Sequence, residues 1–148
     1  MEQETKGPDP TETAVFGAIG NVGETEPELG KRVLSAADEE AVSALPAGSA
    51  LLIVQRGPSA GARFLLDTDR ITAGRHPKSD IFLDDVTVSR KHCEFIRQED
   101  GYLVRDVGSL NGTYIDRERV ESHLLQSGDE VQIGKFRLAY YPAVNFRK

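Results

Sequence analysis

Three short clusters of cationic, hydroxyl and amide side chains lie in the second half of the chain. They read Gly74-Arg75-His76, Val88-Ser89-Arg90-Lys91-His92 and Gly108-Ser109-Leu110-Asn111-Gly112-Thr113. The guanidinium groups of Arg75 and Arg90 match the geometry of phosphate oxygens. The hydroxyls of Ser89 and Ser109, and the backbone N–H groups of such turns, can donate further hydrogen bonds to an anion. Asn111 offers a donor and an acceptor suited to a peptide backbone, so the combined chemistry points to a compact anion on a peptide.

Each of these residues also has a purely structural interpretation. Arg75 could form a surface salt bridge, Ser89 could cap a turn, and Arg90 could be a solvated cation. Asn-Gly is the commonest hairpin sequence, so a turn role for Asn111 is compatible with a binding role. His92 is more typical of a hydrogen-bonding scaffold residue than of a ligand or a catalyst.

A hydrolytic enzyme is a rival hypothesis, because Ser89, His92 and Asp106 are the residue types of a catalytic triad. However, the sequence holds no Gly-x-Ser-x-Gly motif, and no oxyanion hole is obvious near Ser89. The histidines, His76, His92 and His123, do not have the spacing of metal ligands. We therefore expect a binding protein that is not an enzyme, with no metal and no cofactor.

The clusters fall in loops between short apolar or alternating runs, which are typical of β-strands. Turn residues separate the runs, and Gly134-Lys135 between the last two predicts a tight hairpin. About ten such strands within ~95 residues predict an all-β sandwich or barrel. The runs cover residues 50–54, 63–66, 71–73, 81–83, 93–96, 102–107, 113–115, 130–133 and 136–140.

The charge of the chain is unevenly distributed. The 148 residues carry a formal net charge of −6, which argues against a nucleic-acid partner. Residues 1–46 hold ten Asp and Glu against three Lys and Arg, whereas residues 47–148 hold fourteen against fifteen. The single cysteine, Cys93, cannot form an internal disulfide and is expected to be a small buried residue in a reducing cytoplasm. The N-terminus lacks signal-peptide features, and no apolar run approaches the ~20 residues of a membrane span, so we expect a cytoplasmic protein without membrane contact.

Residues 1–46 are rich in Glu, Gly, Pro, Thr and Ala, which predicts a mostly disordered acidic tail. Two islands interrupt this composition. Thr11-Glu12-Thr13-Ala14-Val15-Phe16 places two threonines before two apolar residues. Ser35–Leu45 has an N-cap residue at Ser35 and stops at Pro46, which predicts a helix of about eleven residues that is marginal by itself.

In this order on a run of short strands, the clusters resemble the forkhead-associated (FHA) domain. The family pattern is Gly-Arg, then Ser-x-x-His, then Asn-Gly, and the chain matches it over roughly residues 50–141. The resemblance implies a β-sandwich of about eleven strands over residues 47–148 that binds phosphothreonine peptides with the loops at one end. By this resemblance Arg75 and Ser89 hold the phosphate with help from Arg90, and Asn111 binds the ligand backbone. Gly74, His92 and Gly112 would be architectural.

Longer stretches are similar to the small actinobacterial FHA regulators of central metabolism. The matching segments are residues 79–90, 107–114 and 128–138. This resemblance implies a tail threonine that a Ser/Thr kinase phosphorylates, after which the tail docks onto its own FHA domain. It also implies that the unphosphorylated form binds enzymes around 2-oxoglutarate: the 2-oxoglutarate dehydrogenase component, glutamate dehydrogenase or glutamate synthase.

The tail departs from the pattern of these regulators at one position. Aligned on Val15-Phe16, only Thr13 occupies one of the two phosphoacceptor positions, and Glu12 occupies the other. Thr13 is therefore the expected phosphorylation site, with Thr11 as a second candidate. An alternative function is a generic FHA adaptor that recruits phosphorylated proteins in kinase signalling.

Overall fold

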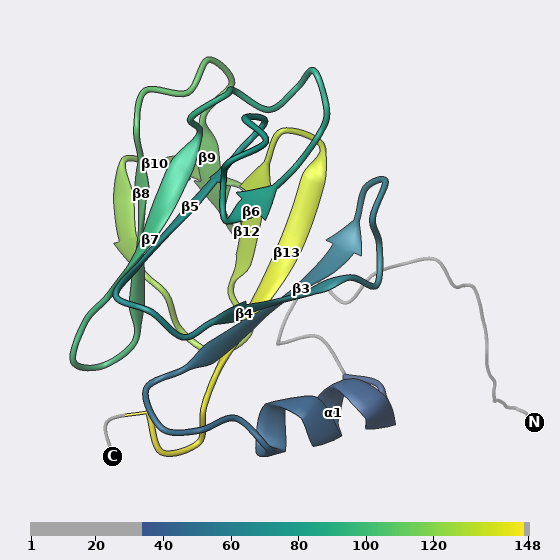
Figure 1. Ribbon diagram of the computed structural model, residues 1–148, viewed down its shortest axis with the longest axis vertical. Coiled ribbons are helices and arrows are strands. Elements are labelled where there is room, and N and C mark those ends of the chain that lie inside the picture. The colour runs from purple at the N-terminus through teal and green to yellow at the C-terminus, as the bar shows by residue number, and fades with distance from the viewer. Residues whose placement is uncertain (1–33, 147–148) are drawn as a thin grey trace, which may run out of the picture. The chain divides into compact units, whose positions relative to one another are not determined.

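The structure, a computed structural model, describes residues 34–146. These residues lie in one compact unit, Val33–Lys148, which holds one helix and eleven strands (Figure 1). The elements are α1 (Ala36–Ser43), β3 (Ala50–Arg56), β4 (Arg63–Leu66), β5 (Arg70–Gly74), β6 (Ile81–Phe82), β7 (Cys93–Arg97), β8 (Tyr102–Asp106), β9 (Thr113–Ile115), β10 (Glu118–Val120), β11 (Ser122–Leu124), β12 (Glu130–Ile133) and β13 (Phe136–Pro142).

The strands form two sheets that pack as a sandwich. The larger sheet has the order β10-β9-β12-β13-β3-β4, and the smaller has the order β11-β8-β7-β5-β6. All pairings are antiparallel except the short parallel pair of β5 and β6. The expected all-β sandwich of about eleven strands is therefore confirmed.

The core between the sheets is made of alternating side chains from both layers. Its largest fully buried members include Phe95 from the smaller sheet and Phe136 from the larger sheet. Two buried tyrosines link the layers, since the hydroxyl of Tyr140 accepts a hydrogen bond of 3.0 Å from the backbone N–H of Tyr102. Burial raises the pKa of Tyr140 to about 12, so this hydroxyl stays neutral.

Strands β3 and β13 are buried on both faces, unlike the edge strands. Leu52 points into the sandwich core, whereas Leu51 and Ile53 form a second apolar cluster with Ala139 and Tyr141 on the outer face. This explains the uninterrupted apolar run at the start of β3, because both faces of that strand have to be covered.

Helix α1 provides the cover on the outer face. Leu34 and three further apolar residues, Ala41, Val42 and Leu45, pack against the second cluster, and Asp38 forms an ion pair of 2.9 Å with Arg63. As expected, Ser35 is the N-cap, its hydroxyl accepting from the backbone N–H of Asp38 at 3.1 Å. The folded part thus extends further toward the N-terminus than the boundary expected at residue 47, because tertiary packing stabilises a helix that is marginal alone.

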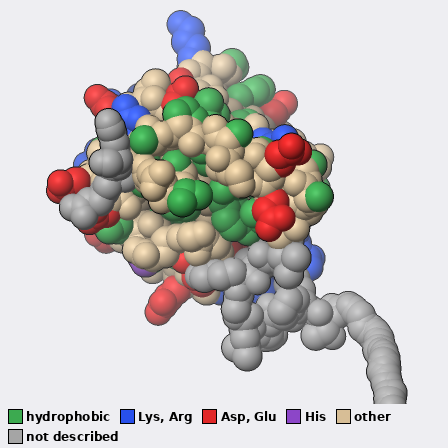
Figure 2. All heavy atoms as spheres, turned by 90° about the horizontal axis from the view of Figure 1, so that it is seen from below, with side chains coloured by type: hydrophobic (Ala, Val, Ile, Leu, Met, Phe, Trp, Pro, Cys, Tyr) green, Lys and Arg blue, Asp and Glu red, His purple; other side chains and the backbone are tan. Residues whose placement is uncertain are grey.

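Figure 1 places α1 at the end of the sandwich where β3 begins and β13 ends, away from the β12–β13 hairpin. Viewed from that end, hydrophobic side chains gather in the middle of the face and charged ones lie at its rim (Figure 2). The loops that carry the three polar clusters lie at the opposite end, near the hairpin.

Strands β10 and β11 were not expected from the sequence. Both are exposed or half-buried edge strands without an apolar alternation, so the pattern that predicts strands is absent. The turn at Asp116 and Arg117, whose φ angles of 48° and 74° are those of a tight type I′-like connection, sets the pairing of β10 with β9, whereas β11 pairs with β8 of the smaller sheet. Within residues 34–146, no helix is long and apolar enough to cross a membrane.

Candidate functional site

The three polar clusters meet at one end of the sandwich. They occupy the segment after β5, the segment before β7 and the connection between β8 and β9. Direct hydrogen bonds join them: the backbone N–H of Arg75 donates to the carbonyl of Ser89 at 3.0 Å, and that of Leu110 donates to the Ser89 hydroxyl at 2.9 Å. Residues separated by up to 35 positions in sequence, Arg75 and Leu110, therefore belong to one surface.

Arg75 is held in place by its own Nε–H. This group donates to the carbonyl oxygen of Val88 at 3.0 Å, and the side chain is half-buried. The guanidinium carries further donors on its two Nη atoms, so one edge is fixed to the protein while the others can serve a ligand. Such a fixed fork loses little rotamer freedom on binding an oxyanion.

Ser89 and Asn111 are also oriented by contacts with the neighbouring loop. The Ser89 oxygen accepts from Leu110, which leaves its own hydrogen to donate to a ligand. Asn111 is exposed, and its Nδ2 donates to the backbone carbonyl of Thr87 at 2.9 Å. Its carbonyl oxygen, Oδ1, is the natural acceptor for a ligand N–H. Arg90 is exposed on the same loop as Ser89.

His92 connects two of the loops from inside. It is fully buried; its Nδ1 accepts from the backbone N–H of Ser89 at 3.1 Å, and its Nε2 lies 2.9 Å from the carbonyl oxygen of Gly112. Both contacts are satisfied only by the neutral ring with the proton on Nε2. Burial lowers the pKa of His92, which favours that neutral form. The expected scaffold role agrees with this geometry.

Two glycines permit close approach between the loops. A Cβ on Gly74 would lie 2.1 Å from the carbonyl oxygen of Arg90, so no side chain fits there. Gly112 has a φ of 89°, and a Cβ there would lie 2.8 Å from Nε of Arg119. The architectural role expected for the two glycines is thus supported by a backbone clash at Gly74, and at Gly112 by the positive φ, because the Arg119 side chain could move.

Ser109 differs from its expected role as a phosphate donor. Its hydroxyl donates to Asp106 at 2.5 Å and accepts from the backbone N–H of Gly112 at 2.9 Å, and the residue is only 9% exposed. Because its single hydrogen is already used, Ser109 shapes the loop instead of offering a donor to a ligand.

Asp106, which was predicted only as a possible member of a catalytic triad, organises that loop. Its carboxylate accepts from the backbone N–H groups of Gly108 and Ser109 at 2.7 and 2.9 Å, and from the Thr113 hydroxyl at 2.7 Å. Burial opposes its ionisation, but these hydrogen bonds outweigh burial and lower the pKa of Asp106. An Asp followed by Gly and Ser at the second and third positions is an Asx-turn signal that could have revealed it.

Thr87 is a second residue that the sequence analysis missed. Its hydroxyl donates to Asp85 at 2.6 Å and accepts from the backbone N–H of Lys135 at 2.9 Å, while its carbonyl accepts from Asn111. The β12–β13 hairpin thereby supports the loop that carries Ser89. The sequence Asp85-Val86-Thr87 is again an Asx-type signal.

The catalytic alternative does not fit the geometry. His92 accepts from the backbone N–H of Ser89, not from its hydroxyl, and Asp106 bonds Ser109 and Thr113. Cys93 is buried as expected, and burial raises the pKa of its thiol. Within residues 34–146, no group of three His, Cys, Asp or Glu could hold a metal ion. Thr11 and Thr13 lie outside the described residues.

The candidate site thus combines an oriented guanidinium, a serine hydroxyl and an exposed amide on three loops joined by hydrogen bonds. The FHA domain family model matches residues 71–134, the part of the chain that contains these loops. The chain belongs to the FHA domain family.

Among its relatives is the "Oxoglutarate dehydrogenase inhibitor" of Corynebacterium efficiens, which is 70% identical over 96 residues, covering 65% of this chain and 68% of that protein. The "Glycogen accumulation regulator GarA" of Mycolicibacterium smegmatis is 66% identical over 99 residues, covering 67% of this chain and 63% of that protein. Among solved structures, Mycobacterium tuberculosis EmbR in complex with a low-affinity phosphopeptide matches with a TM-score of 0.60 and 26% identity, covering 65% of this chain and 25% of that one. The expected resemblance to actinobacterial FHA regulators is confirmed.

Proposed function

We propose that the protein is a non-catalytic, cytoplasmic regulatory protein. It binds phosphothreonine peptides at the three loops that hydrogen bonds join to one another. The observation that carries this proposal is the joint orientation of Arg75, Ser89 and Asn111 by contacts between the loops. Membership of the FHA family and the likeness to a phosphopeptide-bound structure support it.

The phosphate would lie between Arg75 and Ser89. Arg75 offers its Nη donors and Ser89 its hydroxyl hydrogen, and Arg90 adds a nearby positive charge. A phosphate carries about −1.5 to −2 charges near pH 7, so these charge-assisted hydrogen bonds would supply most of the discrimination against an unmodified threonine. Asn111 would bind the backbone of the peptide beside the phosphothreonine.

A depression of about 270 Å³ next to Asn111 is suited to a neighbouring ligand side chain. Tyr114 and Gln132 line it, and the exposed apolar residues Val86 and Leu110 adjoin Thr87 and Asn111 in sequence. Two of the residues after Thr13 are Val and Phe, which match an apolar surface of this kind.

Binding of a phosphothreonine peptide to variants of the full chain tests the proposed site. Arg75→Ala and Ser89→Ala should each weaken binding at least tenfold, which is ~1.4 kcal/mol, measured by calorimetry. Arg117→Asn is a matched control, since it removes an exposed cation from a turn where Asn tolerates the positive φ of 74°. A phosphoserine peptide should bind more weakly than phosphothreonine. Binding that survives both alanine substitutions would contradict the site.

The regulated partner is an enzyme of 2-oxoglutarate metabolism. We infer this from the name of the corynebacterial relative, which makes the 2-oxoglutarate dehydrogenase component the first enzyme to test. Glutamate dehydrogenase and glutamate synthase follow from the resemblance to metabolic FHA regulators. In the proposal, the unphosphorylated protein binds the enzyme through the phosphothreonine-binding face without needing a phosphate on the enzyme.

Competition separates this function from that of a generic adaptor. An excess of phosphothreonine peptide should displace the unphosphorylated protein from purified 2-oxoglutarate dehydrogenase component and relieve any inhibition. An adaptor would instead capture only phosphorylated proteins from a lysate and leave the purified enzyme unaffected. Simultaneous binding of peptide and enzyme would show that the two use separate surfaces.

Phosphorylation of Thr13 by a Ser/Thr kinase would switch the protein off by docking the tail on the same site. Residues 14–33 are the twenty residues between Thr13 and Leu34, and a chain of that length spans at most about 70 Å when extended. A domain of ~100 residues has a radius of gyration of about 13 Å, so the reach is sufficient. A tethered ligand acts at an effective concentration on the order of millimolar, which favours the closed form even at micromolar intrinsic affinity.

The amide NMR signals of Arg75, Ser89 and Asn111 report on this closure. After phosphorylation they should shift, and the shift should not depend on protein concentration. Thr13→Ala should abolish it, whereas Thr11→Ala should leave it in place if Thr13 is the site. A shift that disappears on dilution would indicate docking between two molecules and contradict the intramolecular switch.

A further inference from the structure

A second, positively charged depression lies beside the proposed phosphate site on the smaller sheet. It encloses about 370 Å³. We call it the basic groove and define it by Arg70, Thr72, His76, Lys78, Lys91 and Glu94. Strands β5 and β7 form its floor, and the segment after β5 forms one wall.

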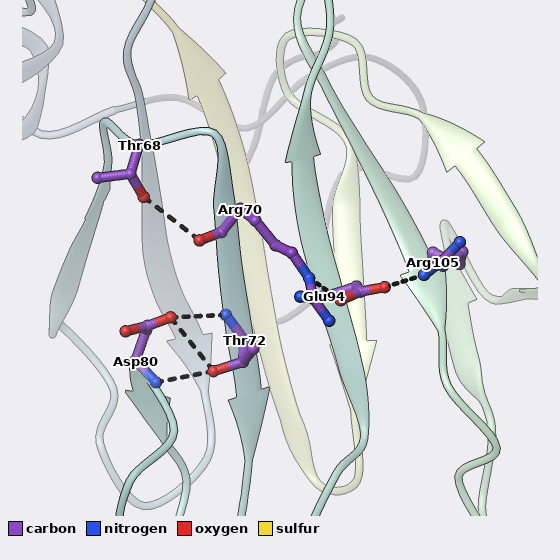
Figure 3. A network of polar contacts seen from close by, with 6 residues as sticks. All are labelled: Thr68, Arg70, Thr72, Asp80, Glu94 and Arg105. Atoms are coloured by element: carbon purple, nitrogen blue, oxygen red, sulfur yellow. Dashed lines mark hydrogen bonds and ion pairs between the residues drawn. The ribbon is translucent and has the colours of Figure 1, made fainter.

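The floor of the groove is built around a buried carboxylate. Glu94 is 1% exposed and bridges two arginines on neighbouring strands, Arg70 at 2.5 Å and Arg105, as Figure 3 shows. Burial opposes ionisation of Glu94, but hydrogen bonds from both arginines lower its pKa overall, so it is charged. Asp80 also lies nearby, and its carboxylate accepts from the backbone N–H and the hydroxyl of Thr72 at 2.9 and 3.2 Å.

These contacts leave the positive charges of two lysines without an acidic partner. Lys78 and Lys91 are exposed, and neither has an ion pair within residues 34–146. His76 adds a donor, because its Nδ1 accepts from the backbone N–H of Lys78 at 3.0 Å and its proton is therefore on Nε2. The groove thus offers cationic groups that face solvent and have no partner of their own.

The groove is continuous with the phosphate site. His76 directly follows Arg75, Lys91 directly follows Arg90, and the backbone N–H of His76 donates to the carbonyl of Arg90 at 3.3 Å. The depression beside Asn111 has a different lining, supplied by the larger sheet and its hairpin. The exposed apolar residues Val86 and Leu110 adjoin Thr87 and Asn111 in sequence, whereas the basic groove carries the two lysines.

We propose that the basic groove binds an acidic peptide segment that precedes the phosphothreonine of a ligand, so that the groove fixes the direction of the bound peptide. The inference rests on the proposed phosphothreonine binding. The sequence around Thr13 has the matching asymmetry. Glu2, Glu4, Asp9 and Glu12 precede Thr13 against a single Lys6, whereas Ala14-Val15-Phe16 follow it. Complementary charge at the rim of a binding site mainly sets orientation and specificity.

Two peptides of residues 2–18, both phosphorylated on Thr13, test the groove. One keeps the native acids, and the other carries Glu2→Gln, Glu4→Gln, Asp9→Asn and Glu12→Gln. The receptor is the full chain with Thr13→Ala and the same four amide substitutions, so that its own tail cannot compete. At low ionic strength we expect the acidic peptide to bind about fivefold more tightly, since exposed ion pairs are individually weak. High salt should remove the difference.

Variants of the receptor then locate the contact. Lys78→Ser with Lys91→Ser should reduce the preference for the acidic peptide to about twofold or less, whereas Arg117→Asn should keep it. Circular dichroism shows whether each variant is folded. Equal affinities for the two peptides would contradict the proposed role of the basic groove without contradicting the phosphate site. A preference for the acidic peptide that persists without the two lysines would also contradict this role, because the acidic residues would then bind elsewhere. Failure of both peptides to bind the parent receptor would contradict phosphothreonine binding itself.

Discussion

At the scale of single residues, His92 shows how a group that need not touch the ligand can decide whether the site exists. Its two ring nitrogens hold the loop of Ser89 and the loop of Gly112 at fixed distances. A protonated ring could not accept from Ser89, so one of the two loops would lose its anchor on protonation. The same residue therefore couples stability to pH.

Loss of the imidazole should change the pH dependence of stability. The folded pKa of His92 is lowered below its ordinary value of 6.5, so the unfolded chain binds the proton more tightly. The stabilisation is fully present above pH 6.5 and is lost as the pH falls toward the folded pKa. Urea unfolding of the wild type should show this decline, and His92→Gln should be less stable by about 1–3 kcal/mol near neutral pH with a flatter profile. Parallel profiles for the two proteins would contradict the assignment.

The carboxylates of the site act in a different pH window. The pKa of Asp106 is lowered below 3.8 and that of Glu94 below 4.5, so their stabilisation is present above those values and lost in more acidic solution. The decline just below pH 6.5 can thus be attributed to His92 without overlap from these groups.

At the scale of elements, the loop that carries Ser89 is supported by the β12–β13 hairpin. The Thr87 hydroxyl accepts a hydrogen bond from the backbone N–H of Lys135, and Gly134 packs against Thr87. The larger sheet thereby positions a loop that leads into a strand of the smaller sheet. This support explains why the hairpin should influence binding through the Ser89 loop, in addition to lining the depression proposed for a ligand side chain.

Gly134→Ala should therefore impair both stability and peptide binding. A Cβ there would lie 2.4 Å from the Thr87 hydroxyl and 2.8 Å from its carbonyl oxygen, at a φ of 60°. We expect a loss of about 2–3 kcal/mol in unfolding free energy, together with weaker phosphopeptide affinity. Gly61→Ala is the matched control, because its φ is 97° but no atom lies within 4 Å of the added Cβ, so only the backbone cost of about 1 kcal/mol applies. Equal effects of the two substitutions on affinity would contradict the role of the hairpin.

At the scale of the whole molecule, the sandwich has two apolar clusters, and the second depends on α1. The outer face of β3 and β13 carries Leu51, Ile53, Ala139 and Tyr141, which the helix covers. Because α1 lies immediately after the tail, it also sets the point from which the proposed regulatory segment departs. A structural element of the FHA unit therefore begins well before its first strand.

Two truncated chains test this view of the folded unit. A chain that starts at residue 33 should unfold at the same urea concentration as the full protein. A chain that starts at residue 47 should lose about 1–3 kcal/mol, because the outer apolar cluster becomes exposed to water. Val42→Asp in the full chain should have a similar effect, and Glu40→Gln on the exposed side of α1 should have almost none. Equal stability of the two truncated chains would show that the helix contributes nothing.

The sandwich could be predicted from local sequence patterns, and the same patterns indicated the residues of the candidate site. Alternating apolar runs and turn residues predicted nine of the strands, and the order of Gly74-Arg75, Ser89 to His92 and Asn111-Gly112 predicted the site. Both signals are local, since each depends on residue type and spacing within a few positions. Strands β10 and β11 lack such a signal, because their pairing depends on a turn and on a sheet edge.

The hydrogen-bond partner of each polar group could not be predicted from the sequence and follows from the tertiary structure. Ser89 and Ser109 have the same side chain in similar loops. The Ser109 hydroxyl donates its hydrogen to Asp106, whereas the Ser89 hydroxyl accepts from the backbone N–H of Leu110 and keeps its hydrogen for another acceptor. Helix α1 also depends on tertiary contacts. It is marginally stable by itself and is stabilised by packing against apolar residues that are distant in the chain. Hydrogen-bond partners and burial depend on which segments meet in space, and residue type does not encode that locally.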